Sequence, residues 1–226
     1  MSRFDAYDGR AEDYAAYRPA YAPETITALV DLTGLESTWV VADVGSGTGN
    51  LARHLVGLAR ETLAIEPNDE MRRQAELALG SFTNFASINA TAEETTLDDE
   101  SVDLVTAGQA LHWFDPVLAK REFARILRPP RLIAVIWNHF DGSEPTETAG
   151  FLDPAAVRRR SLDVTILEPW EAFIGGARSV AHGPLVGDPD YAEFEAAHRR
   201  AFAARAIGGW IEVRYSTEIV VGPLIE

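Results

Sequence analysis

Three glycines at alternate positions follow an acidic residue early in the chain, and this combination is suited to binding a small ligand. Gly45, Gly47 and Gly49 come after the segment 39–44, which is apolar except for Asp43. A buried strand that ends in glycines lets a ligand approach the backbone closely, because glycine has no side chain. Ligands of open α/β sheets bind beyond the carboxyl ends of the strands, so we expect Asp43 and the glycine turn to form one site.

The charge of Asp43 distinguishes between two classes of ligand. A dinucleotide would rest its pyrophosphate on a G-x-G-x-x-G turn, but the sixth position here is Asn50. A carboxylate beside a phosphate is repelled by ~1 kcal/mol at ~4 Å in water and by ~4 kcal/mol at an effective dielectric constant of ~20. S-adenosylmethionine (SAM) carries an ammonium and a sulfonium, which a carboxylate attracts. The sequence therefore favours SAM over a dinucleotide.

A second acidic residue, Glu66, follows the apolar residues 62–65 and is expected at the same edge of the sheet. A carboxylate there can accept hydrogen bonds from the two hydroxyls of a ribose. Both ligand classes contain a ribose, so Glu66 does not separate them. The alternative interpretation of Glu66 is an ordinary surface acid.

Strands and helices alternate along the first 138 residues. We expect helices at residues 23–32, 50–59, 69–79 and 116–127, and strands at residues 39–44, 62–65, 85–88, 102–107 and 131–137. Such alternation predicts right-handed crossovers and an α/β fold, with a Rossmann-like, doubly wound, mostly parallel sheet covered on both faces.

The rest of the chain predicts additions to this core within a single domain over 1–226. An N-terminal arm and helix (1–33) precede the ligand-binding core (34–138), and an insertion and small helical cap follow (139–210). Residues 139–163 are typical of a loop-rich insertion. Residues 211–226 alternate apolar and polar side chains, which predicts a terminal strand at an antiparallel edge.

Composition and charge exclude several classes of function. The formal net charge is −15, and this surface would repel the phosphates of a nucleic acid. No apolar run approaches the ~20 residues of a membrane helix, and no export signal is present, so we expect a cytoplasmic protein. The chain has no cysteine, and no metal-ligand spacing is apparent. Arg158-Arg159-Arg160 is interpreted as a solvated face rather than an anion site.

Five segments in order resemble the motifs of class I SAM-dependent methyltransferases of the methyltransferase type 11 kind. They are VVADVGSGTGN, AIEPNDEM, NATAEETTLDDESVDLV, AGQALHWFD and RLIAVIWN, between residues 40 and 138. The flanks YAAYRPAY, WEAFIGGARS and RYSTEIVVG are similar to the branch that includes trans-aconitate methyltransferase. Two places depart from the family pattern. Thr91 replaces a frequent aspartate, and Arg128-Pro129-Pro130-Arg131 stands where the family usually has K/R-P-G-G.

The resemblance implies a set of SAM contacts at matching positions. Glu66 would bind the ribose, Gln109 would lie beneath the methyl donor, and Arg18 would pair with a carboxylate of SAM or of the acceptor. The full set is Arg18, Asp43, Gly45, Ser46, Gly47, Glu66, Pro67, Met71, Ala92, Glu93 and Gln109.

The methyl acceptor is predicted to be a small molecule, with a carboxylate among the candidates. His112 follows the fourth strand and is the candidate for handling a proton or orienting the acceptor. The residues predicted to contact the acceptor are Tyr14, Tyr17, Trp113, His139, Arg178 and Ser179. The alternatives are a nicotinamide-dependent oxidoreductase and a SAM-binding protein without catalysis.

Overall fold

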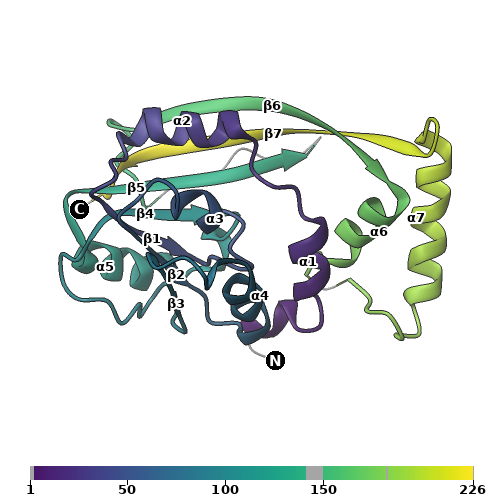
Figure 1. The fold of residues 1–226 in the computed structure, drawn as a ribbon, viewed down its shortest axis with the longest axis horizontal. Helices are drawn as coiled ribbons and strands as arrows, with labels where there is room; N and C mark the ends of the chain where they lie inside the picture. Colours follow the sequence, from purple (N-terminus) through teal and green to yellow (C-terminus); the bar gives the residue numbers. More distant parts are fainter. Residues whose placement is uncertain (1–2, 141–149, 182, 226) are drawn as a thin grey trace.

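A seven-stranded sheet with helices on both faces forms the centre of the protein (Figure 1). The computed structural model describes residues 3–140, 150–181 and 183–225. The strand order is β3-β2-β1-β4-β5-β7-β6. The strands are β1 (Val40–Val44), β2 (Glu61–Ile65), β3 (Phe85–Ile88), β4 (Val102–Gly108), β5 (Leu127–Phe140), β6 (Arg158–Pro169) and β7 (Trp210–Pro223).

The predicted fold class is confirmed by the strand directions. Strands β1 to β5 are parallel, and β7 is antiparallel to both β5 and β6. Strand order reverses at β1, which has β2 on one side and β4 on the other. All five residues of β1 are buried, because helices cover both faces of the sheet at this strand. The reversal creates a crevice at the carboxyl ends of these strands.

Two hydrophobic clusters occupy the two faces of the sheet. One contains Phe123 of helix α5, and the other contains Leu29 of helix α2. The helices are η1 (Arg3–Tyr7), α1 (Ala11–Tyr17), α2 (Pro23–Thr33), α3 (Ala52–Leu55), α4 (Asp69–Leu79), η2 (Leu111–Trp113), α5 (Pro116–Ile126), α6 (Trp170–Arg178) and α7 (Tyr191–Arg205), where η marks a 3₁₀ helix. Among the described residues, no helix has the length and apolar character required to cross a membrane.

Side-chain caps fix the starts of two helices where the sequence predicts them. Asn68 accepts a hydrogen bond from the Met71 amide at 2.9 Å, and Asp115 accepts from the Val117 and Leu118 amides at 3.0 Å. Helix α3 is shorter than the predicted helix at 50–59. The chain turns after Leu55, whose carbonyl accepts hydrogen bonds from two later amides, near the exposed and helix-disfavouring Gly57.

The prediction of a loop-rich insertion at 139–163 is wrong for the parts that the structure describes. Strand β5 continues to Phe140, and β6 begins at Arg158; residues 141–149 lie outside the described ranges. Strand β6 is the outermost strand, with β7 between it and β5, so two strands form the antiparallel edge. Strand β6 was missed because it begins with three exposed arginines and has no buried residue, so its sequence lacks the apolar run of an inner strand. Charged side chains are common on strands at the edge of a sheet.

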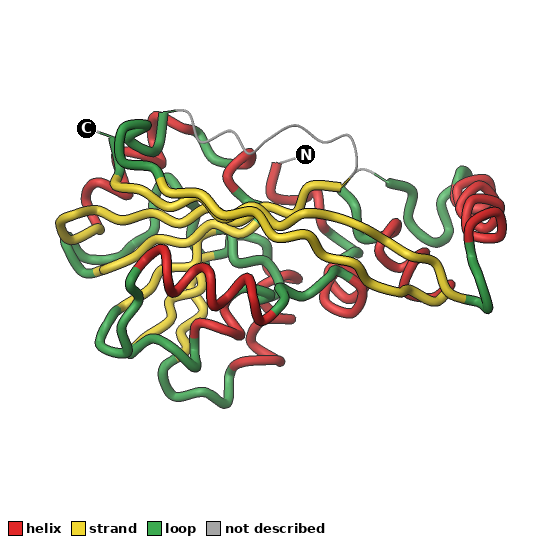
Figure 2. The backbone as a smooth tube through the Cα atoms, turned by 90° about the horizontal axis from the view of Figure 1, so that it is seen from above, coloured by secondary structure: helices red, strands yellow, loops and turns green. Residues whose placement is uncertain are grey.

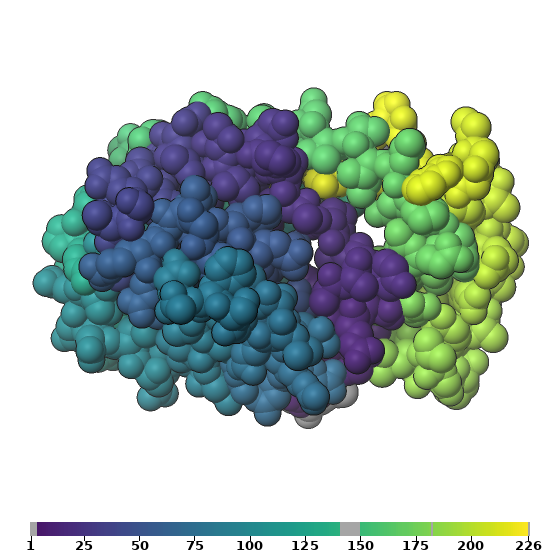
Figure 3. Space-filling view, viewed as in Figure 1, coloured from purple at the N-terminus to yellow at the C-terminus, as the bar shows by residue number. Residues whose placement is uncertain are grey.

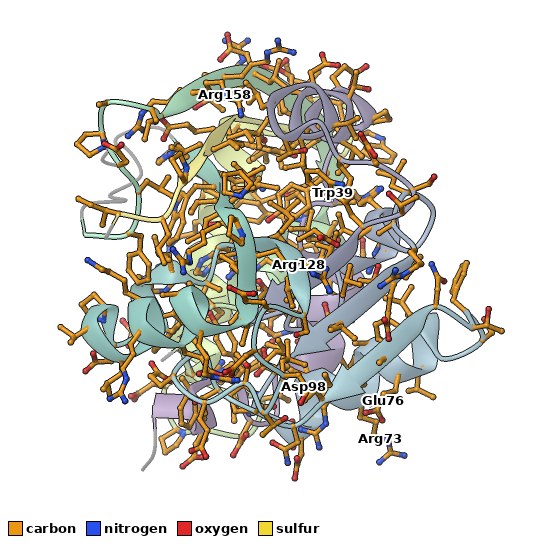
Figure 4. The ribbon with its side chains drawn as sticks, turned by 90° about the vertical axis from the view of Figure 1, so that its left-hand side faces the viewer. Trp39, Arg73, Glu76, Asp98, Arg128 and Arg158 are labelled. Carbon is orange, nitrogen blue, oxygen red and sulfur yellow. The ribbon has the colours of Figure 1, made fainter. Side chains whose placement is uncertain are left out.

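The arginine run at the start of β6 is solvated, as predicted. Figure 4 shows Arg158 at the margin of the sheet. Arg159 pairs with Glu218 at 2.9 Å, and Arg160 pairs with Asp31 at 3.2 Å. At the Pro129-Pro130 turn, Arg131 adopts the positive φ (59°) that a glycine would permit.

Strands β5, β6 and β7 carry the sheet beyond the parallel strands toward α6 and α7 (Figures 1 and 2). We call α6 and α7 the helical cap, and residues 3–22 the N-terminal arm. Helix α1 of the arm packs against α6, where a side chain on Gly175 would overlap the ring of Tyr17. The arm therefore bridges the core and the helical cap.

Candidate functional site

Two adjoining cavities lie at the carboxyl ends of β1, β2 and β4. The first has about 670 Å³ of open space and the second about 880 Å³. They share the walls formed by Tyr7, Tyr14, Gly45, Gly47, Gly108 and Gln109. Figure 3 shows a gap in the surface between the N-terminal arm and the helical cap. The arm thus forms part of the walls of both cavities.

The first cavity is mainly apolar, with a carboxylate on one wall. Glu66 accepts hydrogen bonds at 2.9 Å from the amides of Gly47 and Asn68, and burial raises its pKa. The buried Met71 and Ala92 lie on the wall, and Glu93 is held where its Oε1 accepts from the Asp115 amide at 2.7 Å. A flat apolar group with adjacent hydroxyls would fit these walls.

Two glycines of the turn after β1 have different roles, one in packing and one in leaving space for a ligand. Gly45 has φ +67°, and a Cβ there would lie 2.5 Å from the Cβ of Ala110. Gly47 has φ +56°, but a Cβ there would have no atom within 4 Å. Gly45 is therefore required by packing against the protein, whereas Gly47 faces open space that a ligand could fill.

Asp43 is buried on β1 between the two neighbouring strands, and it lines the second cavity. Its Oδ1 accepts from the Thr106 hydroxyl at 2.8 Å, while Oδ2 has no hydrogen-bond partner among the described residues. Burial raises the pKa of Asp43 to about 7, although the hydrogen bond from Thr106 lowers it. A buried carboxylate with one unpartnered oxygen is a site for a cationic group.

The second cavity also contains a cationic side chain. Arg18 has a buried Nε without a hydrogen-bond partner among the described residues, and its guanidinium stacks on Tyr14 at 5.1 Å from the ring centroid. The Ser46 hydroxyl is buried and unpartnered in the same part of the structure. Burial raises the pKa of Tyr14 to about 12, so this ring stays neutral. The cavity can therefore hold a ligand that carries both charges.

His112 and Gln109 come from the segment after β4. His112 packs on Trp137 and Trp113, with ring centroids 5.0 and 4.8 Å away, and burial lowers its pKa. Gln109 has φ +58°, which is uncommon for a residue other than glycine. Its backbone amide donates to the Ile136 carbonyl at 2.9 Å. This backbone geometry lets Gln109 border both cavities.

Asn68 ties the N-terminal arm to the first cavity. Its Nδ2 donates to the Phe4 carbonyl and to Asp8, each at 2.8 Å, while its Oδ1 caps α4. We expect Asn68→Ala to lower the free energy of unfolding by about 1–3 kcal/mol, because it removes a helix cap and the hydrogen bonds to the arm. Urea titration measures this loss. Asn68→Ser is the control: its hydroxyl keeps an uncharged cap acceptor without the donors to the arm, so a loss as large as that of alanine would contradict the cap contribution.

The structure brings most of the predicted site residues to the cavities. Those on the cavity walls are Tyr14, Arg18, Asp43, Gly45, Ser46, Gly47, Glu66, Pro67, Met71, Ala92, Glu93, Gln109, His112 and Trp113. Four residues predicted to contact the acceptor do not line either cavity: Tyr17, His139, Arg178 and Ser179.

These four side chains make other contacts instead. Arg178 forms a two-point ion pair with Asp13 (2.7 and 2.8 Å), and the Ser179 hydroxyl donates to the Gly176 carbonyl. Tyr17 packs on α6. His139 lies 3.2 Å from Glu218, on the face of β5 opposite to its neighbours in the strand.

Several cavity residues were not predicted. They are Phe4, Tyr7, Pro19, Asn50, Leu51, Asn68, Gly108, Ala110, Asn138 and Phe140. Asn138 could have been found from its place at the end of a predicted strand, where parallel sheets bind ligands. Phe4 and Tyr7 carry no such signal, because only the path of the arm brings them to the site. Among the described residues, no group of three or more His, Asp or Glu side chains is placed to hold a metal ion.

Known proteins are similar to this chain in sequence and in fold. Residues 42–135 match the family model described as a methyltransferase domain. An uncharacterized methyltransferase of Mycobacterium tuberculosis is 39% identical over 128 residues, which cover 57% of this chain and 50% of the relative. One of Schizosaccharomyces pombe is 34% identical over 134 residues (59% and 52%). The chain spans about half the length of these curated relatives.

Solved structures share the fold over nearly the whole chain. The YcgJ protein of Bacillus subtilis has a TM-score of 0.61 at 18% identity and covers 91% of this chain and 100% of its own. The [4+2]-cyclase SpnF has a TM-score of 0.57 at 15% identity (98% and 95%). The fold alone therefore does not define the reaction.

The family match over residues 42–135 and the curated relatives support a methyltransferase domain, and the Rossmann-like sheet agrees with it. Over residues 42–135 the chain resembles the class I SAM-dependent methyltransferases.

Proposed function

We propose that this protein transfers a methyl group from SAM to a small-molecule acceptor, with a carboxylate as the leading acceptor class. The observation that carries the proposal is Asp43, a buried carboxylate with one unpartnered oxygen beside the glycine turn. The single-domain organisation with limits at 33, 138 and 210 and the cytoplasmic location remain predictions, as does similarity to the trans-aconitate methyltransferase branch.

The residues present fit SAM at both ends. In this assignment Asp43 holds the ammonium and Arg18 holds a carboxylate, and the Gly47 turn leaves room between them. Glu66 binds the ribose, while Met71 and the segment at 92–93 enclose the adenine. The support is that each charged group of the ligand has a complementary group in the cavities.

SAM supplies an electrophilic methyl group on its sulfonium. The chain's own part is to orient the acceptor and exclude water, and orientation alone is worth about 7–11 kcal/mol. Trp113 and Tyr14 line the cavities, while His112 and Gln109 face the space beyond β4. A carboxylate acceptor needs no proton removed. A hydroxyl acceptor would need a base, and His112 is suited to it because its lowered pKa keeps the ring neutral at pH 7.

One relative supports a carboxylate acceptor. A malonyl-[acyl-carrier protein] O-methyltransferase of a Marinomonas species is 28% identical over 134 residues, covering 56% of this chain and 47% of its own. A malonyl thioester has a free carboxylate. Among the described residues, Arg18 is the only arginine or lysine on the walls of the two cavities. Its guanidinium can pair with the carboxylate of an acceptor.

Calorimetry with SAM and S-adenosylhomocysteine (SAH) tests the cofactor assignment directly. We expect both to bind, and we expect SAH to be released when small carboxylic acids are added with SAM. An absence of heat from either compound at high micromolar concentration would contradict the proposal. NADH fluorescence titration tests the oxidoreductase alternative, and turnover with any acceptor excludes a SAM-binding protein without catalysis.

We expect Arg18→Gln to weaken SAH binding by about 10- to 150-fold, because a charge-assisted hydrogen bond to a carboxylate is lost. Calorimetry measures the affinity. Arg160→Gln is the matched control, since Arg160 pairs with Asp31 on the surface. An unchanged SAH affinity with a raised acceptor KM would assign Arg18 to the acceptor instead. No change in either would contradict a carboxylate-binding role.

A further inference from the structure

One buried amide in the second cavity has no role in the assignments above. Asn138, near the end of β5, lines the cavity and is only 9% exposed. Its partner across the strands is Thr217 of β7, which is 1% exposed. The Thr217 hydroxyl donates to Oδ1 of Asn138 at 2.8 Å. This hydrogen bond sets which end of the amide faces away from β7.

The consequence is an unused pair of donors. Because Oδ1 accepts from Thr217, Nδ2 is the end of the amide left for another partner, and the described part of the chain shows no hydrogen bond from it. Asn138 lines the cavity, so a donor that the protein leaves without a partner there is available to a ligand or to water. Asn138 therefore indicates a ligand that presents a hydrogen-bond acceptor at this wall.

The surroundings of Asn138 belong to the acceptor side of the site. His112 and Phe140 line the same cavity, and Phe140 packs on Tyr215 with ring centroids 5.3 Å apart. None of the assigned SAM contacts lies on β5: they come from β1 and the turn after it, the end of β2, helix α4, the segment at 92–93 and the arm. A carboxylate has only acceptor atoms, so it suits an amide whose oxygen is turned away. A net charge of −15 makes local donors necessary if an anion is to bind.

We propose that Asn138 is a specificity residue that donates from Nδ2 to a carboxylate oxygen of the methyl acceptor. Thr217 is its positioning residue, because its hydroxyl fixes the orientation of the amide. This inference rests on the proposed function and deepens it by naming the group that recognises the acceptor.

The test uses the full chain with SAH bound, so that binding is measured apart from chemistry. Glutarate and citrate are titrated by calorimetry, with glutaramide as the uncharged analogue of glutarate. We expect at least one of the two acids to bind and the diamide not to bind. SAH release from SAM with the same compounds gives kcat and KM.

Four variants separate positioning from folding. We expect Asn138→Asp, which has the same shape, to weaken acid binding about 10- to 150-fold because a donor becomes an anion. Thr217→Val should raise the acceptor KM about 3- to 10-fold with little change in kcat, and Thr217→Ser should restore it. Thr165→Val makes the same hydroxyl-to-methyl change at an exposed position of β6 and should have no effect.

The outcomes distinguish this inference from the function on which it rests. SAH binding within about threefold of wild type in every variant shows that the cofactor site is intact. If wild type binds SAH but neither acid, or if Asn138→Asp leaves acid binding unchanged, the inference is overturned and the methyltransferase proposal stands. If wild type does not bind SAH, the proposed function fails, and this inference with it.

Discussion

Replacing Asp43 with asparagine is expected to weaken SAM binding about 10- to 150-fold and, at the same time, to stabilise the ligand-free protein. The loss of affinity follows from removing the only carboxylate with an unpartnered oxygen in the second cavity, as far as the described residues show. The gain in stability follows from removing a buried charge that burial disfavours. Calorimetry measures the affinity, and urea titration measures the free energy of unfolding.

The sign of the stability effect follows from the pKa of Asp43. In the unfolded chain this carboxyl ionises near the ordinary value of 3.8, whereas in the folded protein it ionises at about 7. Between these values the unfolded state has released the proton and the folded state has kept it. The contribution of Asp43 to stability therefore falls as the pH rises from about 4 to 7 and stays low above 7. Asp43→Asn should remove a penalty of the order of 1–4 kcal/mol at pH 8.

Binding has the opposite dependence on pH. Below about pH 7 the free protein carries a neutral Asp43, which must lose its proton before it attracts a cation. Between pH 7 and 5.5 we expect SAH affinity to fall by up to about tenfold per pH unit in wild type, and this fall should be absent in Asp43→Asn. Asp103→Asn is the matched control, because Asp103 pairs with Arg128 at the other end of β4. If Asp43→Asn binds SAH as tightly as wild type, the proposed attraction between Asp43 and the ammonium is wrong.

Alanine at two glycines of the same turn is expected to have two different effects. Gly45→Ala combines an unfavourable positive φ with a Cβ 2.5 Å from Ala110, so we expect a loss of about 2–5 kcal/mol in the free energy of unfolding. Gly47→Ala has the strain but no close atom, so we expect a loss of about 1–2 kcal/mol. Its methyl group would occupy ligand space, and SAH affinity should fall at least tenfold.

Thermal and urea unfolding measure the free energy of unfolding of both variants. Calorimetry measures the SAH affinity of the folded Gly47→Ala protein. The pair serves as its own control, since the substitution and the sign of φ are the same. Equal losses of stability would contradict the packing role of Gly45. Unchanged SAH affinity in Gly47→Ala would mean that the ligand does not approach this turn.

The sequence by itself determined the features that depend on neighbours along the chain. Asn68 and Asp115 cap the helices that follow them, because a capping side chain bonds amides two or three residues away. The apolar runs that became β1 and β2 were recognisable because burial on both faces demands continuous apolar residues. The charge of Asp43 favoured SAM as the ligand, whereas Glu66 indicated only a ribose.

Only the tertiary structure decided which distant residues complete the site. Asn138 and Thr217 are 79 positions apart, and their hydrogen bond exists because β7 inserts between β5 and β6. Tyr7 reaches the cavities because the arm folds back over the sheet, whereas Arg178 is removed from them by its ion pair with Asp13. No pattern along the chain encodes these contacts, since they arise from the burial and pairing of segments that are separate in sequence.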